Sequence, residues 1–496
     1  MKKTCSLFAF IVCLSFNAIA QNSTEISAGY MRANSQYTPV CACEDLLEVS
    51  LPNVVIESSI FNKEDNTCRV TAIVTHPPFD DKVKVVTALP KDNWNGRFIG
   101  YGGAGFSGGE LSSLSEPVSK GFATGCTNAG HDGEQLSGSF ALDKEHGRLR
   151  WQEIRDFSYL GIHDMTVIGK ELVKAYYGKP ARYSYFIGGS TGGRQALTEV
   201  QMYPRDYDGV IALNPAIYWN HFIIGHLWPQ AVMFDADNFV TKDEFKAVTD
   251  AVINACDGDD GNLDGVIDNP INCSWDPVSL VGTKTGESIF TEADADVVRQ
   301  IWEGPRSDDG EFLWYGTTRG SDITIHASSG EPMMPLVIGG EEWVRYFLLL
   351  NPDWNSKSLT KAEFYSLFYQ SVEQYATTFE AGNPDLSAFR DSGGKLLILQ
   401  GLSDNIIPPE GIINYYKNIR DLMGDYKTTS KFARLFLFPG DDHGFAGPGG
   451  QPVGYLDALI KWVEEGKAPD HLKAESRDNS GVVMKTRTIF PYKGDE

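Results

Sequence analysis

Hydrophobic and polar residues alternate along the first part of the chain in a way that predicts β-strands. Residues 68–74 (Cys-Arg-Val-Thr-Ala-Ile-Val) and 84–89 (Lys-Val-Val-Thr-Ala-Leu) are examples from a strand-like region at about 51–98. The apolar spacing becomes helical over residues 151–177, where Gly178 and Pro180 then act as stop signals. Apolar runs at 183–187 and 210–213 predict two further strands with a helix between them.

Residues 215–383 interrupt this alternation of strands and helices. The α/β pattern resumes with strands at 395–400 and 433–438, and a last helix is expected at about 455–465. We therefore predict an α/β fold in which one sheet domain, residues 21–214 and 384–496, is interrupted by a lid insertion at 215–383. The insertion carries seven of the ten tryptophans, namely Trp219, Trp228, Trp275, Trp302, Trp314, Trp343 and Trp354.

The first twenty residues have the pattern of a secretory signal peptide. Lys2 and Lys3 supply the positive start, residues 7–16 the apolar stretch, and Ala18-Ile19-Ala20 a cleavage site. The apolar stretch is too short to span a bilayer, and no later one is long enough. We expect a secreted or periplasmic protein after cleavage near Ala20.

Cysteine usage fits an exported protein. Of the eight cysteines, Cys5 and Cys13 belong to the leader. The remaining even set favours disulfides over the alternative of buried thiols, although the sequence leaves the pairing open. These six are Cys41, Cys43, Cys68, Cys126, Cys256 and Cys273.

The formal net charge of −23 limits the partners of the protein. Such an acidic surface disfavours nucleic acid and anionic membranes. The charge carries no information about the reaction, which has to come from motifs.

A candidate nucleophile, Ser190, lies in the segment Gly188-Gly189-Ser190-Thr191-Gly192. An apolar strand precedes it and a helical segment follows it, which is the context of the nucleophile elbow of α/β-hydrolases. Small residues let the backbone turn sharply there and leave the serine hydroxyl exposed. A second Gly-x-Ser-x-Gly, around Ser107, lies in a glycine-rich run with no helical pattern after it. Context therefore selects Ser190 and predicts cleavage of an acyl bond.

A serine nucleophile needs a base, and the base needs an acid that fixes its tautomer. In α/β-hydrolases these follow in the order Ser, Asp/Glu, His, each on a loop after a strand. Asp404 follows the strand predicted at 395–400, and His443 follows the strand at 433–438. His471, the other histidine beyond Asp404, comes after the last helix and fits a solvated surface position. We predict the triad Ser190, His443 and Asp404, with ordinary turn and loop roles for the latter two as the simpler alternative.

The oxyanion hole is expected to use two backbone N–H groups. Thr191 follows the nucleophile and supplies the first. The second should come from the glycine-rich loop, where Gly103, Ala104 and Gly105 are all candidates. The start of the helix after Ser190 would add partial positive charge.

Residues 256–268 form an acidic loop rich in the hard oxygen ligands that Ca²⁺ prefers. Asp260, Asn262, Asp264 and Gly265 match the opening of an EF-hand loop, but Ile271 stands where the bidentate Glu belongs. The loop is therefore a structural calcium site of another kind or, alternatively, a solvated acidic turn.

These features together resemble the tannase/feruloyl esterase family of secreted α/β-hydrolases over nearly all of the mature chain. The resemblance implies disulfides Cys256–Cys273 and Cys43–Cys68, and it assigns no partner to Cys41 or Cys126. The matching segments are residues 94–98, the glycine-rich loop, 130–131, 176–178, 188–197, 203–209, and Gly401 with Asp404. The calcium ligands that it implies are the side chains of Asp257, Asp260 and Asp264 and the carbonyl groups of Asn262 and Val266.

The chain departs from this family at one pair of positions. The family usually has disulfide-linked cysteines just before the serine and just after the histidine, whereas Gly189 and Gly444 stand here. Because both cysteines are missing together, no thiol is left stranded beside the triad. We predict that catalysis persists and that mild reduction does not disconnect Ser190 from His443.

We predict a serine esterase that hydrolyses aromatic carboxylic esters, such as feruloyl, galloyl or related phenolic esters, through an acyl-enzyme. The aromatic lid agrees with an aromatic acyl group, although the same side chains could equally be the core of the lid. The expected partner is a small aromatic ester, free or attached to plant polysaccharide or polyphenol. Structural Ca²⁺ is the expected cofactor. The alternatives are a general carboxylesterase or peptidase of the same fold, and a catalytically silent, calcium-stabilised binding protein.

Overall fold

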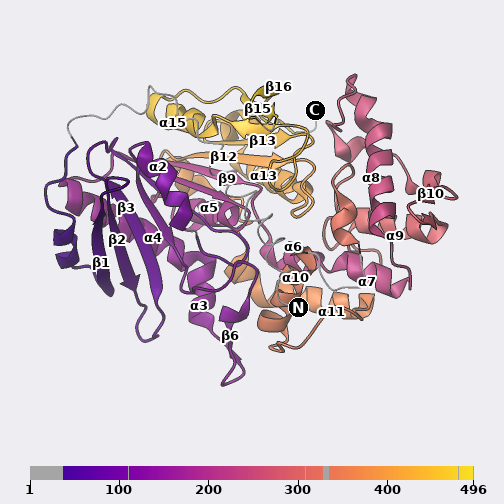
Figure 1. Cartoon of the computed structure of the whole chain (residues 1–496), viewed down its shortest axis with the longest axis horizontal. Helices are drawn as coiled ribbons and strands as arrows, with labels where there is room; N and C mark the ends of the chain where they lie inside the picture. The colour runs from indigo at the N-terminus through magenta and orange to yellow at the C-terminus, as the bar shows by residue number, and fades with distance from the viewer. Residues whose placement is uncertain (1–36, 110, 308, 328–334, 479, 495–496) are drawn as a thin grey trace.

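A nine-stranded mixed β-sheet forms the centre of the molecule (Figure 1). The computed structural model describes residues 37–494 except 110, 308, 328–334 and 479, so the predicted leader lies outside the described residues. The strands lie in the order β1-β2-β3-β5-β4-β8-β9-β12-β13. Their bounds are β1 Val54–Asn62, β2 Thr67–Val74, β3 Val83–Pro90, β4 Arg97–Tyr101, β5 Ala123–Thr127, β8 Tyr183–Gly189, β9 Gly209–Leu213, β12 Lys395–Gly401 and β13 Ala433–Phe438.

The sheet is antiparallel at one edge and parallel elsewhere. β1, β2, β3 and β5 pair antiparallel. From β5 through β4, β8, β9 and β12 to β13 all pairs are parallel. The carboxyl ends of β8, β12 and β13 therefore lie at the same edge, where the loops predicted to carry the triad begin.

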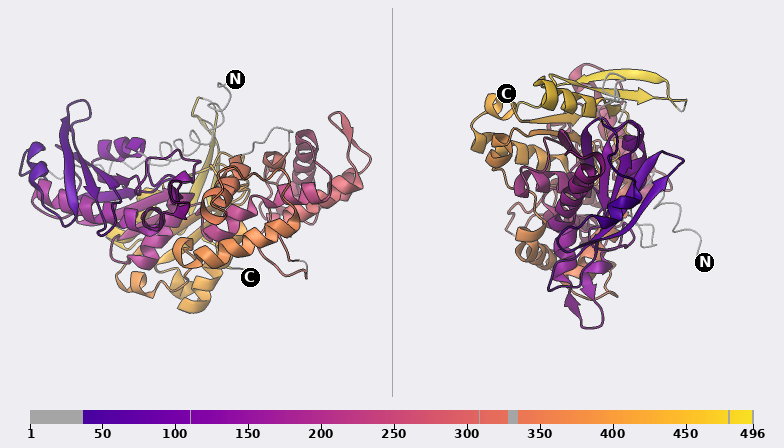
Figure 2. Two further views of the ribbon diagram at one scale, coloured as in Figure 1. Left: turned by 90° about the horizontal axis from the view of Figure 1, so that it is seen from below. Right: turned by 90° about the vertical axis from the view of Figure 1, so that its left-hand side faces the viewer.

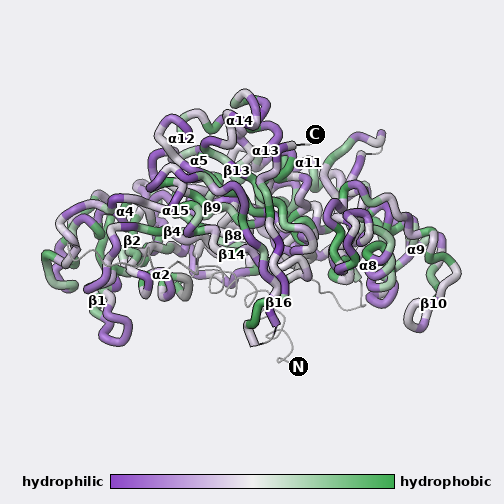
Figure 3. The backbone as a smooth tube through the Cα atoms, turned by 90° about the horizontal axis from the view of Figure 1, so that it is seen from above, coloured by the Kyte–Doolittle hydropathy of each residue, from purple (hydrophilic) through white to green (hydrophobic). Residues whose placement is uncertain are grey.

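Helices and a small sheet cover the two faces. α4 Gly161–Tyr177, α5 Thr191–Met202 and α13 Pro409–Met423 share one hydrophobic core with the strands. On the other face α15 Tyr455–Glu465 packs together with β15 Leu472–Arg477 and β16 Val483–Ile489, which pair with each other beside β14 Gln451–Val453. Because the parallel strands are buried on both faces, their sequences are continuously apolar. Figure 3 shows these hydrophobic segments gathered in the central strands.

The helix predicted at 151–177 is present in three parts. α3 Trp151–Arg155 is followed by a π-helical turn, Asp156–Leu160, and then by α4. Gly178 ends α4 with φ +70°, a left-handed conformation that favours glycine. The remaining helices of this domain are short: α2 Ser115–Ser119, α12 Ser387–Asp391 and α14 Tyr426–Thr429.

The regular structure of residues 215–383 is mainly helical. Its helices are α6 Trp219–Gly225, α7 Trp228–Asp235, α8 Lys242–Cys256, α9 Glu292–Glu303, α10 Pro335–Trp343 and α11 Lys361–Phe379. Capping boxes at Thr241, Thr291 and Thr360 fix the starts of α8, α9 and α11. Most of the tryptophans here are buried in a core that the insertion shares with the α3–α4 segment. Figure 2 shows the insertion extending from the sheet on the side away from β1.

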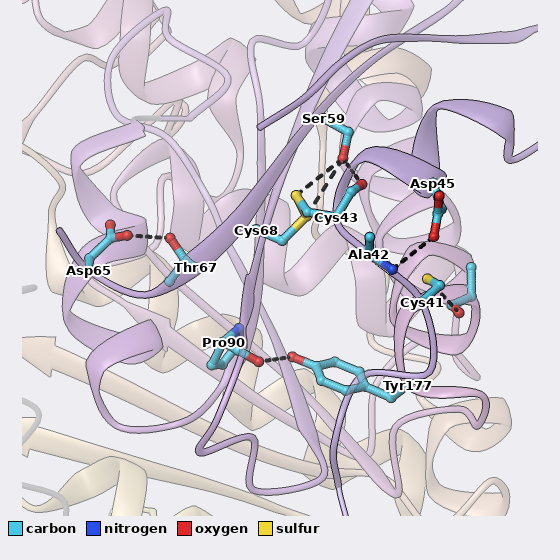
Figure 4. The surroundings of a disulfide bond; sticks show 11 residues. Cys41, Ala42, Cys43, Asp45, Ser59, Asp65, Thr67, Cys68, Pro90 and Tyr177 are labelled. Atoms are coloured by element: carbon cyan, nitrogen blue, oxygen red, sulfur yellow. Dashed lines mark hydrogen bonds between the residues drawn. A yellow bond between two sulfur atoms is a disulfide. The ribbon is translucent and has the colours of Figure 1, made fainter. Parts of the chain in front are cut away.

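Two disulfides have the expected pairing. Cys43–Cys68 joins the segment before β1 to β2, and the Ser59 hydroxyl donates to the Cys43 carbonyl at 2.5 Å (Figure 4). Cys256–Cys273 closes the acidic loop. In the part of the chain that the structure describes, Cys41 and Cys126 form no disulfide. No helix among the same residues is long and apolar enough to cross a bilayer.

Candidate active site

Ser190 occupies a sharp turn between β8 and α5. Its backbone has φ 57° and ψ −119°, which is strained for a residue with a side chain. The turn requires its two flanking glycines because the backbones approach closely. A Cβ on Gly188 would lie 2.1 Å from the Gly192 carbonyl oxygen, and one on Gly192 would lie 2.9 Å from the Gly103 oxygen. Close packing of the elbow thus explains the Gly-x-Ser-x-Gly pattern at this position.

The structure brings the three predicted triad residues together. His443 Nε2 lies 3.0 Å from Ser190 Oγ, and His443 Nδ1 lies 2.8 Å from Asp404 Oδ2. The three side chains come from loops after β8, β12 and β13, which are not all neighbours in sequence but lie at one sheet edge. His443 and Asp404 are 4% and 1% exposed, so their contact is shielded from water.

Asp404 is held by neutral donors as well as by His443. Its Oδ1 accepts hydrogen bonds from the backbone N–H groups of Ile406 at 2.9 Å and Ile407 at 2.8 Å. The Gln400 amide donates to Oδ2 at 3.2 Å. These bonds orient the carboxylate toward the imidazole and satisfy its remaining oxygen lone pairs.

Asn214 links the loops of the acid and the base, a role that the sequence did not reveal. Its Nδ2 donates to the His443 carbonyl at 2.8 Å, and its Oδ1 accepts from the Gly401 N–H at 2.8 Å. The residue is 1% exposed and has φ +38°, a conformation that Asn tolerates better than most side chains. Asn214 directly follows Leu213, whose carbonyl accepts from the Ser190 N–H at 2.9 Å. This chain of hydrogen bonds ties all three triad loops to the end of β9.

The glycine-rich loop is fastened to the first turns of α5. Gly103 N–H donates to Gln195 Oε1 at 2.9 Å, so this predicted oxyanion donor is already engaged and the expectation for Gly103 is corrected. The Thr191 hydroxyl donates to the Gly105 carbonyl at 2.5 Å. Among the described residues, the N–H groups of Thr191, Ala104 and Gly105 have no hydrogen-bond acceptor. All three remain available for an oxyanion.

Ser107 and His471 are not part of the triad. The Ser107 hydroxyl donates to the Gly109 carbonyl at 3.2 Å, within the glycine-rich loop. His471 is exposed beside Phe490. Gly444, at one of the family's cysteine positions, donates its N–H to Asp442 Oδ1 at 2.8 Å, so a side-chain cap supports the loop after the histidine.

The acidic loop of the insertion folds around Asp257. Its Oδ1 accepts from the N–H groups of Asp264, Gly265 and Val266 at 3.1, 2.9 and 3.0 Å. Asp264 is also paired with Lys485 and Arg487 of β16. Asp264 Oδ1 is buried and accepts no hydrogen bond from the described residues, as a metal-ligand oxygen would. The three predicted aspartate ligands nevertheless do not converge to within 4.8 Å of one another, so calcium binding would require them to move closer.

An aromatic pocket lies beside Asp404, at the boundary with the insertion. Phe222, Trp314 and Tyr315 contribute to its wall, together with His226. Burial lowers the pKa of His226 to about 4, which keeps this imidazole neutral at ordinary pH. Ser190 is not part of the lining, so the pocket adjoins the acid of the triad and not the nucleophile.

The model of the family "Tannase and feruloyl esterase" matches residues 68–494. The chain belongs to this family. It is 38% identical over 444 residues to a "Probable feruloyl esterase" of Arthroderma benhamiae, covering 87% of this chain and 83% of that protein. It is 30% identical to feruloyl esterase B of Aspergillus niger, with 82% and 78% covered. The crystal structure of feruloyl esterase B from Aspergillus oryzae superimposes with a TM-score of 0.80 at 29% identity, over 91% of this chain and 95% of that one.

Membership establishes the fold class and the broad reaction. The α/β-hydrolase fold and the resemblance inferred from the sequence are confirmed, and the protein is a carboxylic ester hydrolase. Tannin acyl hydrolase from Aspergillus niger shares the fold, with a TM-score of 0.77 at 22% identity, over 90% of each chain.

Proposed function

We propose that the protein is a serine esterase for phenolic carboxylic esters, with Ser190 as nucleophile, His443 as base and Asp404 as the acid that orients His443. The observation that carries the proposal is the position of His443, whose two ring nitrogens lie 3.0 Å from Ser190 Oγ and 2.8 Å from Asp404 Oδ2. An imidazole held in this way accepts the serine proton at Nε2 while Nδ1–H donates to the carboxylate.

The reaction follows from these contacts. Ser190 Oγ attacks the ester carbonyl carbon as its proton moves to His443 Nε2, and the N–H groups of Thr191 and Ala104 stabilise the oxyanion. The tetrahedral intermediate collapses, and His443 gives the proton to the departing alcohol. Water, deprotonated by His443, then attacks the acyl-enzyme and releases the carboxylic acid with Ser190 restored.

The acyl group of the substrate is proposed to be a hydroxylated aromatic acid. Support comes from the relatives, which are named feruloyl esterases. The alcohol part is left open, because no described contact selects it.

The test is hydrolysis of methyl ferulate, methyl gallate and p-nitrophenyl butyrate by the purified protein. Ser190→Ala is compared with Ser107→Ala, which removes the serine of the other Gly-x-Ser-x-Gly and should leave turnover intact. Loss of aromatic ester turnover in the Ser190 variant alone is the expected result. Turnover of the butyrate alone would point to a general carboxylesterase. A folded protein that turns over none of the three and resists a fluorophosphonate probe would support the silent binding protein.

We further propose that the acidic loop binds structural Ca²⁺. The donor set is made of hard oxygens, and the buried, unpartnered Asp264 Oδ1 suits a cation. Val266 of this loop packs against Gly440, close to His443 in sequence, so an ordered loop would support the base. Calcium should raise the melting temperature of wild-type protein and of Asp259→Asn, an exposed neighbour, but not that of Asp264→Asn. Equal calcium responses in all three proteins would refute the proposed ligand set.

A further inference from the structure

A second histidine–aspartate cluster, made of a half-buried histidine and carboxylates that are mostly buried, lies outside the active site. His76 and Asp81 belong to the loop between β2 and β3, whereas Asp156 starts the π-helical turn and Asp164 lies in the first turn of α4. His76 Nδ1 lies 2.7 Å from Asp81 Oδ2 and 3.6 Å from Asp156 Oδ1, and His76 Nε2 lies 3.3 Å from Asp164 Oδ2. Two segments that are distant in sequence thus place four ionisable groups together.

The cluster has more negative than positive groups. Within the described residues, every ion pair of Asp81, Asp156 and Asp164 is made with the single imidazole of His76. The side chains of Asp81 and Asp156 are 1% and 0% exposed. Burying several carboxylates without matching positive charge is costly, so such a group either takes up protons or binds a cation.

Only one carboxylate oxygen of Asp156 accepts a hydrogen bond from the described residues. The Gln152 amide donates to Asp156 Oδ1 at 2.9 Å and orients the carboxyl group. The other oxygen, Oδ2, is buried and accepts no hydrogen bond from the described residues. One ligand atom from each of His76, Asp81 and Asp156 already lies within 4.8 Å of the other two.

The surroundings of His76 also resemble those of a metal-bound imidazole. Nδ1 faces Asp81 and Asp156, while Nε2 on the opposite side of the ring faces Asp164. Metal-ligating histidines usually donate their second ring N–H to a carboxylate, which fixes the tautomer and the ring orientation. The His76 backbone N–H also donates to Asp81 Oδ1 at 2.9 Å, which orients that carboxylate.

We propose that His76 Nδ1, Asp81 and Asp156 bind one divalent transition-metal ion, with Zn²⁺ as the best-fitting ion, while Asp164 holds the other ring nitrogen of His76. Mixed imidazole and carboxylate ligands suit Zn²⁺, whereas Ca²⁺ and Mg²⁺ prefer oxygen alone. The ligand atoms would close in until each lies about 2.0–2.2 Å from the ion. The ion would join the β2–β3 loop to the α3–α4 segment and take no part in ester hydrolysis.

The test is calorimetric titration of the full mature protein with Zn²⁺, after chelator treatment and in saturating Ca²⁺ so that the acidic loop does not compete. Asp80→Asn, the exposed neighbour in the same loop, is the matched control for Asp156→Asn. Wild type and Asp80→Asn should each bind one equivalent. Asp156→Asn should lose this binding, and Asp164→Asn should weaken it about 10- to 100-fold.

A second readout protects the test against misfolding. Cobalt(II) placed in the same site should give visible absorption bands in the wild type, and His76→Gln should change them without loss of far-ultraviolet circular dichroism. Equal binding by Asp156→Asn and wild type would overturn the proposal. So would a folded wild-type protein that binds no Zn²⁺, which would identify the cluster as a protonated His76 shared by carboxylates.

Discussion

The molecule contains two histidine–aspartate groups that are built from the same residue types. They differ in their balance of charge and in burial, since His443 is buried and His76 is half-buried. At the active site one imidazole, His443, meets one carboxylate, Asp404, whose other lone pairs accept neutral backbone and amide donors. In the second group one imidazole, His76, faces three carboxylates.

The contrast indicates that the number of hydrogen-bond donors per carboxylate decides whether a histidine–aspartate group can hold an imidazole or needs an added cation. A carboxylate with all of its lone pairs satisfied can hold an imidazole in one tautomer and stabilise its charge as the charge appears. Carboxylates in excess instead need a cation or protons. The same two residue types therefore suit the proposed proton transfer at one place and the proposed metal binding at the other.

Removing the charge of Asp404 should have the largest effect. Asp404→Asn should lower kcat about 10³- to 10⁴-fold. The amide oxygen would keep the bonds from the Ile406 and Ile407 N–H groups, so the amide NH2 would face His443 Nδ1 and favour the wrong tautomer. His76→Gln, the corresponding change in the other group, should leave kcat within about twofold, since His76 does not touch the reacting atoms. Steady-state kinetics on methyl ferulate measures both. Similar losses in the two variants would abolish the distinction between the groups.

Substitution of Asn214 tests whether one side-chain amide holds the loops of His443 and Asp404 in place. Asn214→Ala should lower kcat about 10- to 100-fold by releasing the His443 loop. It should also cost about 1–3 kcal/mol of stability, because the Gly401 N–H is left unsatisfied.

Asn214→Asp separates these hydrogen bonds from backbone strain. Asp tolerates the left-handed conformation as Asn does, yet it cannot donate to the His443 carbonyl. Loss of activity in both variants would support a role for the Asn214 hydrogen bonds in holding the loops. Full activity of Asn214→Asp would show that only the backbone conformation matters.

Glu410 is a carboxyl group whose surroundings should make the stability of the fold depend on pH. Burial raises its pKa to about 7, with the Thr318 hydroxyl donating to Oε2 at 3.5 Å. The unfolded chain ionises this carboxyl at a lower pH than the folded protein does, so the wild type loses stability as pH rises from about 4.5 to about 7. Glu410→Gln should lack this loss, which is at most about 3 kcal/mol. Melting temperatures across this pH range measure it, with Glu373→Gln, an exposed carboxylate on α11, as control. Parallel pH profiles for all three proteins would contradict the assignment.

Reduction should have the smallest effect on turnover. Gly189 and Gly444 carry no thiols, and hydrogen bonds through Asn214 hold the loops in place. Mild thiol treatment at fixed Ca²⁺ should therefore change the initial rate less than about twofold. If thiol treatment lowers the rate strongly, the double variant Cys256→Ser, Cys273→Ser shows whether the loop disulfide is the cause, because it lacks that disulfide before reduction.

The sequence predicted the parts of the molecule that depend on local pattern. The strand–turn–helix context predicts the sharp turn at Ser190, and the positions of Asp404 and His443 after strands predict that they lie near it. Close contacts of the Gly188 and Gly192 backbones explain why that context is reliable. The engagement of Gly103 by Gln195 was not predictable, because it depends on how a loop and a helix distant in sequence pack together.

Asn214 and the His76 group show the limit of such prediction. Asn214 belongs to no sequence motif. Its role comes from two hydrogen bonds, to Gly401 and His443, which lie 187 and 229 residues later in the chain. His76, Asp81, Asp156 and Asp164 have no metal-ligand spacing in the sequence, since a hairpin loop and a helix pair bring them together only in the fold.

The path of the chain through the sheet has a consequence for biosynthesis. His443 follows Ser190 by 253 residues, with the whole insertion made in between. A nascent chain can form the serine elbow and the insertion, but it has no base until β13 has joined the sheet beside β12. With the proposed roles of Ser190 and His443, the enzyme is inactive throughout most of its synthesis, and a chain that ends within the insertion has a nucleophile without a base.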